Sequence, residues 1–198
     1  CDAFECVDFV TVESWTTGAS NFITIKPAAG AEHDGSDVTT GFRLKPNTIY
    51  SLGLKIKQRY TVVEGIGIDC TANTTTRGIE LSDSAGYIIA KRLIIEGSYN
   101  RGIYIISPNS TAQNCRVVMA TSGTNGIYFA PAVAGAANMS AYNCTIIGPA
   151  STAGIEYGRS AVTGHSIVKN CVVIGCTVDY IKVGDDAADY CATDLASG

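Results

Sequence analysis

The chain contains four copies of a short glycine-isoleucine motif, and their spacing decides the fold. The copies are Gly78-Ile79-Glu80-Leu81, Gly102-Ile103-Tyr104-Ile105, Gly126-Ile127-Tyr128-Phe129 and Gly154-Ile155-Glu156-Tyr157. Successive copies begin 24, 24 and 28 residues apart, and a degenerate fifth copy, Tyr180-Ile181-Lys182-Val183, begins 26 residues after the fourth. A period of this length with short β-type units is typical of solenoid proteins. We expect the second residue of each copy to point inward, so that one apolar stack contains Ile79, Ile103, Ile127, Ile155 and Ile181.

A second repeat lies between the copies of the first and keeps phase with it. Its copies are Glu64-Gly65, Lys91-Arg92, Asn114-Cys115, Asn143-Cys144 and Asn170-Cys171. Just before each copy comes a small or β-branched residue, as expected for a strand whose alternate side chains point inward. This column is predicted to be a second inward stack and consists of Val62, Ile89, Ala112, Ala141 and Val168. The asparagines of the repeat suggest a buried amide ladder. The two phased repeats require at least two strands per coil, and together with this third column they predict three.

Composition supports this interpretation. The chain has 198 residues, 21 of them glycine, and no window with sustained helical periodicity. Short apolar runs at fixed spacing predict an all-β, single-domain parallel β-helix with a period of about 23–29 residues. Right-handed winding is the default for parallel crossovers. We divide the chain into less regular coils over residues 1–60 and regular coils over 61–198.

Charge and hydropathy exclude two kinds of partner. The net charge is −4, and the 14 basic residues are scattered along the chain, so we expect no nucleic-acid partner. No apolar run reaches about 18 residues, so we expect no membrane span.

The eight cysteines favour an oxidising environment. Cys1, Cys6 and Cys191 are candidates for disulfides or for bridges between subunits. Cys115, Cys144 and Cys171 share one column, where neighbours lie about 4.8 Å apart, a spacing that a disulfide tolerates. Only one pair of the three can bridge, and a stack of buried thiols is the favoured alternative.

The N-terminal part resembles a known group of proteins. A Trp15-Thr16-Thr17 turn, a Phe22-Ile23-Thr24-Ile25 strand and a His33-Asp34-Gly35 turn precede the regular coils, and Asp189-Tyr190-Cys191 looks like a last coil. This order is similar to that of right-handed β-helix proteins of the pectin-lyase-like superfamily, of the secreted bacterial, environmental or phage-associated type. The resemblance implies secretion and leaves the chemistry open, because the superfamily includes lyases, hydrolases, phage tailspikes and non-enzymatic surface proteins.

The outward column of the glycine-isoleucine strands does not suit catalysis. It is predicted to contain Glu80, Tyr104, Tyr128, Glu156 and Lys182. Its two acids are three coils apart, about 14 Å at 4.8 Å per coil, whereas glycosidases need about 5–9.5 Å. His33-Asp34 is interpreted as a turn. We expect no catalytic residue, metal or cofactor; if the chain were an enzyme, it would be a polysaccharide lyase or a glycoside hydrolase.

Sugar binding stays open beside a purely structural role. Flat aromatic rings with polar flanks hold sugars in many proteins, but outward aromatics on a sheet also stabilise cross-strand stacks. The predicted carbohydrate-facing surface consists of Arg77, Glu80, Arg101, Tyr104, Asn125, Tyr128 and Glu156.

We expect a non-catalytic extracellular β-solenoid with a structural role at a cell or virion surface. Because solenoid ends expose strand edges, we expect self-association, either head to tail into a filament or as a homo-oligomer. The alternative is a phage tailspike-like module that binds or processes a polysaccharide.

Overall fold

The protein is a parallel β-solenoid. The computed structural model describes residues 5–6, 10–46, 52–71, 77–130, 138–149, 153–157, 166–181, 187–189 and 191–193. Over these ranges it contains 22 strands and no helix. The strands form three sheets, and every pairing within a sheet is parallel. This confirms the predicted all-β solenoid with three strands per coil.

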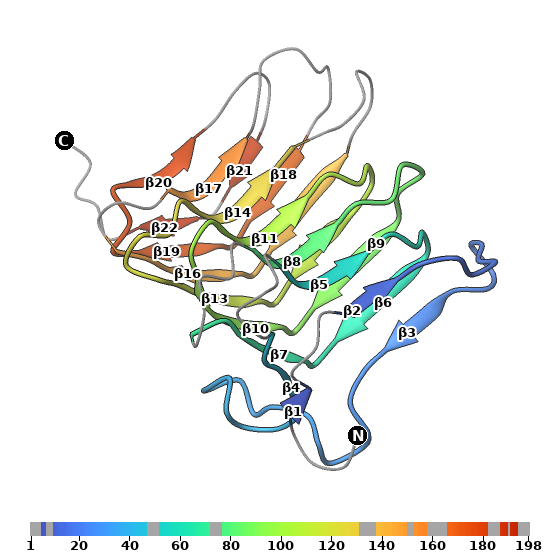
Figure 1. Ribbon diagram of the computed structural model, residues 1–198. Coiled ribbons are helices and arrows are strands. Elements are labelled where there is room, and N and C mark those ends of the chain that lie inside the picture. The colour runs from blue at the N-terminus through green and yellow to red at the C-terminus, as the bar shows by residue number, and fades with distance from the viewer. Residues whose placement is uncertain are drawn as a thin grey trace.

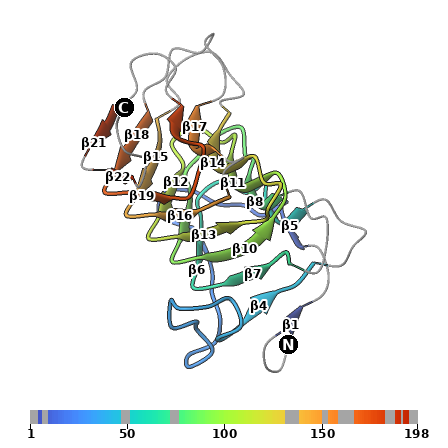
Figure 2. The same ribbon diagram turned by 90° about the vertical axis from the view of Figure 1, so that its left-hand side faces the viewer.

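Each coil contributes one strand to each sheet, so that strands three apart in the chain are neighbours (Figure 1). Sheet 1 contains β1 (Glu5–Cys6), β4 (Arg43–Leu44), β7 (Gly67–Asp69), β10 (Ile94–Ser98), β13 (Arg116–Met119), β16 (Thr145–Ile147), β19 (Val172–Ile174) and β22 (Ala192–Thr193). Sheet 2 contains β2 (Val10–Val12), β5 (Leu52–Ile56), β8 (Arg77–Leu81), β11 (Arg101–Ile105), β14 (Asn125–Phe129), β17 (Ala153–Tyr157) and β20 (Val178–Ile181). Sheet 3 contains β3 (Ile23–Ile25), β6 (Thr61–Glu64), β9 (Ile88–Lys91), β12 (Thr111–Gln113), β15 (Met139–Tyr142), β18 (Ser166–Lys169) and β21 (Ala187–Asp189). Figure 2 shows the strands stacked from the N-terminal coils at one end to the C-terminal coils at the other.

The glycine-isoleucine motif forms the strands of sheet 2. Ile79, Ile103, Ile127 and Ile155 are in register and buried, as predicted. The predicted fifth member, Ile181, is wrong by one position, because Tyr180 pairs with Ile155 and Ile181 pairs with Glu156. The degenerate copy lacks the glycine that would have fixed its alignment.

The α-carbon of the glycine in each copy faces the core, and the space beside it is too small for a side chain. A methyl group on Gly102 would overlap Cγ1 of Val117 in sheet 1 and lie 2.7 Å from the carbonyl oxygen of Gly126 in the next coil. Gly78, Gly126 and Gly154 are crowded by sheet 1 side chains in the same way. The motif therefore repeats because sheets 1 and 2 approach closely at this column.

The second repeat forms the corner between sheets 3 and 1. One residue of each copy has a positive φ between 50° and 70°, a conformation for which glycine and asparagine are the usual residues; these residues are Gly65, Arg92, Asn114, Asn143 and Asn170. The predicted alignment was therefore wrong by one position in the first two copies, because Gly65 and Arg92, not Glu64 and Lys91, correspond to the asparagines. Asn143 donates from Nδ2 to Oδ1 of Asn114 at 3.0 Å, so an amide ladder exists. However, both asparagines are exposed, so the prediction of a buried ladder was wrong.

The second inward stack also needs a correction. Val62 and Ile89 were predicted to point inward, but they pair with each other and are only partly buried. A shift of one residue moves a strand's side chains to the opposite face. The inward positions belong instead to their chain neighbours, and the stack consists of Val63, Ala90, Ala112, Ala141 and Val168.

Candidate functional site

The predicted carbohydrate-facing residues do lie together on the outer face of sheet 2. Glu80, Tyr104, Tyr128 and Glu156 form one column in register, and Lys55 precedes them. A parallel column of flanking residues contains Arg77, Arg101 and Asn125. We call these eight residues the sheet 2 row. Lys182 was predicted to extend this column, but Ile181 is the residue that pairs with Glu156, so that prediction was wrong by one position; Lys182 itself lies outside the described residues.

The acid at one end of the row is held in ion pairs. Oε1 of Glu80 lies 2.6 Å from Nζ of Lys55, and Arg77 contacts the other carboxylate oxygen. The Glu80 side chain is only 3% exposed. Burial raises the pKa of Glu80, but hydrogen bonds and charges from Lys55 and Arg77 outweigh burial, and the pKa lies below its ordinary value of 4.5. This carboxyl is therefore ionised at neutral pH and is unsuited to donate a proton.

The tyrosines of the row are covered by guanidinium groups. Arg77 and Arg101 lie 4.6 and 4.4 Å from the centre of the Tyr104 ring, and Arg101 also lies 4.2 Å from the Tyr128 ring. The two rings are 5.7 Å apart and tilted by 37°. Such cation–π contacts stabilise neighbouring coils. A sugar ring that stacked on Tyr104 would have to displace an arginine.

The row offers no pair of catalytic acids. Asn125 donates to Glu156, which is separated from Glu80 by the Tyr104 and Tyr128 coils. Three coil steps of about 4.8 Å place the two carboxylates about 14 Å apart, beyond the separation that glycoside hydrolysis uses.

The His33-Asp34 segment is a turn, as predicted. Asp34 accepts hydrogen bonds from the Ser36 hydroxyl at 2.6 Å, the Ser36 amide at 2.9 Å and the Thr40 hydroxyl at 3.0 Å. These bonds lower the pKa of Asp34 to about 2. Nε2 of His33 lies 2.5 Å from the carbonyl oxygen of Arg92, so this nitrogen carries a proton and donates it. Both side chains are thus engaged in local hydrogen bonds, as expected for a structural segment.

The described cysteines carry no disulfide. Cys70, Cys115, Cys144, Cys171, Cys176 and Cys191 are all free thiols. Cys115 donates to the carbonyl oxygen of Ala90 at 3.5 Å, and Cys144 and Cys171 donate to the coil before them at 3.7 Å. This is the predicted stack of buried thiols. Cys1 lies outside the described residues and nothing is described of the Cys6 side chain, so bridges between subunits stay a prediction.

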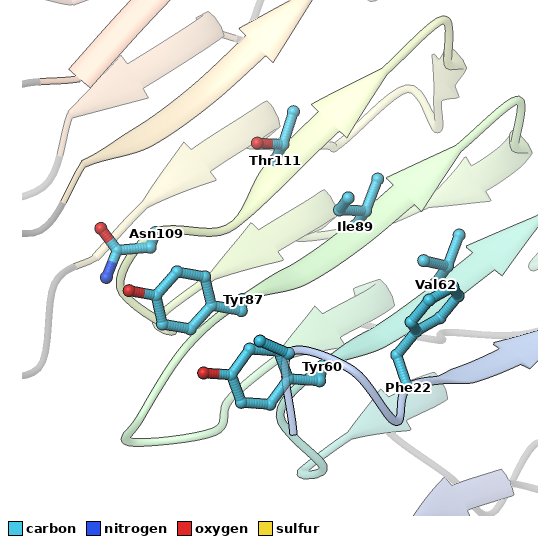
Figure 3. A pocket seen from close by; sticks show the side chains of 8 residues that line it. Phe22, Tyr60, Val62, Tyr87, Ile89, Asn109 and Thr111 are labelled. Atoms are coloured by element: carbon cyan, nitrogen blue, oxygen red, sulfur yellow. The ribbon is translucent and has the colours of Figure 1, made fainter. Parts of the chain in front are cut away.

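A second surface, which the sequence did not reveal, lies on the outer face of sheet 3. Two outward columns enclose an open groove of about 330 Å³ (Figure 3). One column precedes the strands and consists of Phe22, Tyr60, Tyr87 and Asn109. The other lies on the strands and consists of Val62, Ile89 and Thr111. We call this hollow the sheet 3 groove.

Two of the three aromatic rings of the groove are exposed to solvent, and the third, Tyr60, is partly buried. The Tyr60 and Tyr87 rings are parallel within 3°, with centres 5.1 Å apart. Phe22 is 59% exposed and Tyr87 is 49% exposed. Figure 3 shows both tyrosine hydroxyls directed to the side of the groove on which the Asn109 amide lies. A sequence signal existed, since Tyr60-Thr61-Val62 and Tyr87-Ile88-Ile89 repeat the same aromatic-x-aliphatic pattern.

Among the described residues, no three histidine, cysteine or acidic side chains gather closely enough to hold a metal ion. The same part of the chain contains no apolar helix of membrane-spanning length.

Comparisons of this chain with protein-family models, with curated proteins and with solved structures give no match. The class of protein is therefore defined by its architecture, a parallel β-solenoid with three sheets.

Proposed function

We propose that this chain is a non-catalytic β-solenoid with a structural role at a cell or virion surface. The observation that carries the proposal is the sheet 2 row, whose polar side chains pair with one another. Glu80 contacts Lys55 and Arg77, and Arg101 lies against both tyrosines. Catalytic sites need charged groups that converge on open space and have pKa values matched to their task. The pairing within this row favours a scaffold instead.

The test is a depolymerisation assay with a matched acid variant. Wild-type protein and the double variant Glu80→Gln with Glu156→Gln are incubated with neutral and acidic polysaccharides, and new reducing ends and unsaturated ends are measured. We expect the two proteins to behave alike. Cleavage by the wild type that the double variant loses would contradict the non-catalytic proposal and favour a lyase or hydrolase.

Self-association and an extracellular location are further parts of the proposal. Parallel pairing along each sheet gives a geometry by which a second copy can add strands at the end of a sheet. A head-to-tail contact that does not close on itself gives a filament. Membership of the pectin-lyase-like superfamily and an extracellular location are proposed from the sequence resemblance. The described cysteines form no disulfide and so add no support for an oxidising environment. Sedimentation velocity under oxidising conditions is the test, and a monomer at high concentration would end the filament proposal.

A tailspike-like or polysaccharide-binding module is the second candidate function. One observation favours it, namely the sheet 3 groove with its open aromatic rings. Binding at this groove and a structural role are compatible, and separate experiments test them.

A further inference from the structure

We propose that the sheet 3 groove binds a neutral saccharide, with a sugar ring stacked on Tyr87 and Tyr60. This inference deepens the second candidate function and does not depend on self-association or on the absence of catalysis. It also relocates the binding surface, because the sequence had suggested Tyr104 and Tyr128 on sheet 2.

The backbone of the groove gives the first argument. Tyr60 has φ 52° and Tyr87 has φ 64°, in the left-handed region. Bulky residues are rarely found there, whereas asparagine is enriched. The equivalent position in the next coil is Asn109, with φ 52°. The fold thus accepts asparagine at this turn, yet two coils keep a tyrosine at a backbone cost. Such an outlier motivates a functional hypothesis for the side chain.

The exposure of the rings gives the second argument. In the sheet 2 row, Arg77 from the preceding coil and Arg101 from the same strand lie 4.6 and 4.4 Å from the Tyr104 ring centre. In the groove, the one described cation near a ring is Arg59, at 5.9 Å from the Tyr60 centre. Tyr87 remains half exposed and is available for stacking.

The lining chemistry identifies the ligand. The groove residues are aromatic, aliphatic, amide or hydroxyl, and none carries a charge. A sugar ring combines an apolar C–H face with a rim of hydroxyl groups. The tyrosine rings match the face, while the Tyr60, Tyr87 and Asn109 polar groups match the rim. A charged saccharide would find no opposite charge in this lining, so the neutral class fits best.

The size of the groove distinguishes a small ligand from a protein partner. Its volume of about 330 Å³ lies at the lower end of the range for small-molecule sites, about 300–1,000 Å³. A stable protein interface needs roughly 800 Å² from each partner, far more than one such hollow supplies. We therefore assign the groove to one segment of a saccharide chain.

Wild-type protein is titrated with three neutral hexasaccharides, cellohexaose, laminarihexaose and maltohexaose, and with hexagalacturonate as the acidic comparison. Binding is followed by calorimetry and by the NMR chemical shifts of the tyrosine ring protons. The test variant is Tyr87→Asn, which removes the ring and keeps a residue suited to positive φ. Tyr60→Asn is the second test variant. Tyr99→Asn is the matched control, because Tyr99 is also exposed but lies outside the groove. Circular dichroism verifies that each variant is folded.

We expect one neutral hexasaccharide to bind, with about tenfold loss of affinity in each test variant and no loss in the control. Three results would overturn the inference: no neutral sugar bound at about 10 mM, where even weak sites fill; binding that neither test variant changes; or binding of hexagalacturonate alone. Loss of binding only on replacing Tyr104 and Tyr128 by alanine would return the site to sheet 2. None of these results bears on the structural role, which sedimentation and the cleavage assay test.

Discussion

The substitution Gly102→Ala tests the packing of sheet 2 against sheet 1. A methyl group at this position would lie 2.7 Å from the carbonyl oxygen of Gly126, whereas C–H···O contacts in sheets are about 3.3–3.6 Å. It would also overlap Cγ1 of Val117, a side chain with no exposed surface. The backbone oxygen cannot retreat without opening the pairing between β11 and β14.

The expected loss of stability follows from these contacts. Overpacking of a core costs about 1–3 kcal/mol, and a backbone oxygen among the crowded atoms places this site at the upper end. Replacing glycine by alanine also lowers the conformational entropy of the unfolded chain, which stabilises the folded state by about 0.4–1 kcal/mol. We therefore expect Gly102→Ala to lower the free energy of unfolding by about 2 kcal/mol, measured by urea denaturation followed by circular dichroism.

Two controls make the result specific. Gly18→Ala has nothing within 4 Å of the added methyl group and should change stability by less than about 1 kcal/mol. Val117→Ala alone should destabilise, but combined with Gly102→Ala it removes one of the clashes, so the double variant should lose less than the sum of the single losses. Equal midpoints for Gly102→Ala and Gly18→Ala would refute the close approach of the two sheets.

Three further predictions follow from the core, the row and the thiols. Ile127→Asp should abolish folding because it buries an unpaired carboxylate. Ile127→Val should lower the free energy of unfolding by only about 0.5–1.5 kcal/mol. A native β-rich circular dichroism spectrum of the aspartate variant would contradict the register. Glu80→Gln should lower the free energy of unfolding at pH 7 by about 1–3 kcal/mol. The folded pKa of Glu80 lies below the ordinary 4.5. The difference in unfolding free energy between wild type and variant should therefore have its full size above pH 4.5 and shrink as the pH falls through the folded pKa. A difference that stays constant from pH 7 to acid would argue against the ion pairs. Hydrogen bonding to neighbouring thiols, together with burial, raises the pKa of Cys144 and Cys171. Both thiols should therefore resist thiol reagents in the native protein and react after denaturation without reductant, and rapid native labelling of either would show that the stack is open.

The sequence predicted the solenoid because its glycines and corner residues are under strict geometric demands. Gly78, Gly102, Gly126 and Gly154 stand where a side chain would overlap sheet 1, and the corner residues need a left-handed backbone. These positions tolerate few residue types, so they repeat visibly. The inward stack from Ile79 to Ile155 could be read directly from this spacing.

The facing of sheet 3 was harder to predict. Val62-Val63 and Ile88-Ile89 place apolar residues on both faces of a strand, so alternation alone does not distinguish inside from outside. The outward members look like core residues because they line the groove. The same ambiguity misplaced Ile181, where Tyr180 takes the inward position beside Ile155.

Only part of the groove could be predicted from the chain, because the repeated Tyr60-Thr61-Val62 and Tyr87-Ile88-Ile89 pattern is visible in the sequence but the face on which it lies is not. Phe22 comes from the less regular N-terminal coils, and its alignment with Tyr60 follows only from the pairing of β3 with β6. Tyr60 and Tyr87 adopt a backbone conformation that their residue type does not favour. The Arg77 and Arg101 contacts that cover the sheet 2 tyrosines depend on rotamers, which spacing does not determine.

The alignment of the coils is the central claim, because both the sheet 2 row and the sheet 3 groove depend on it. Nuclear Overhauser effects between labelled tyrosine rings test it most directly. The account predicts cross-peaks between Tyr60 and Tyr87, whose ring centres lie 5.1 Å apart, and between Tyr104 and Tyr128, at 5.7 Å. Absence of both cross-peaks in the folded protein, or contacts that join Tyr87 to Tyr104 instead, would contradict it.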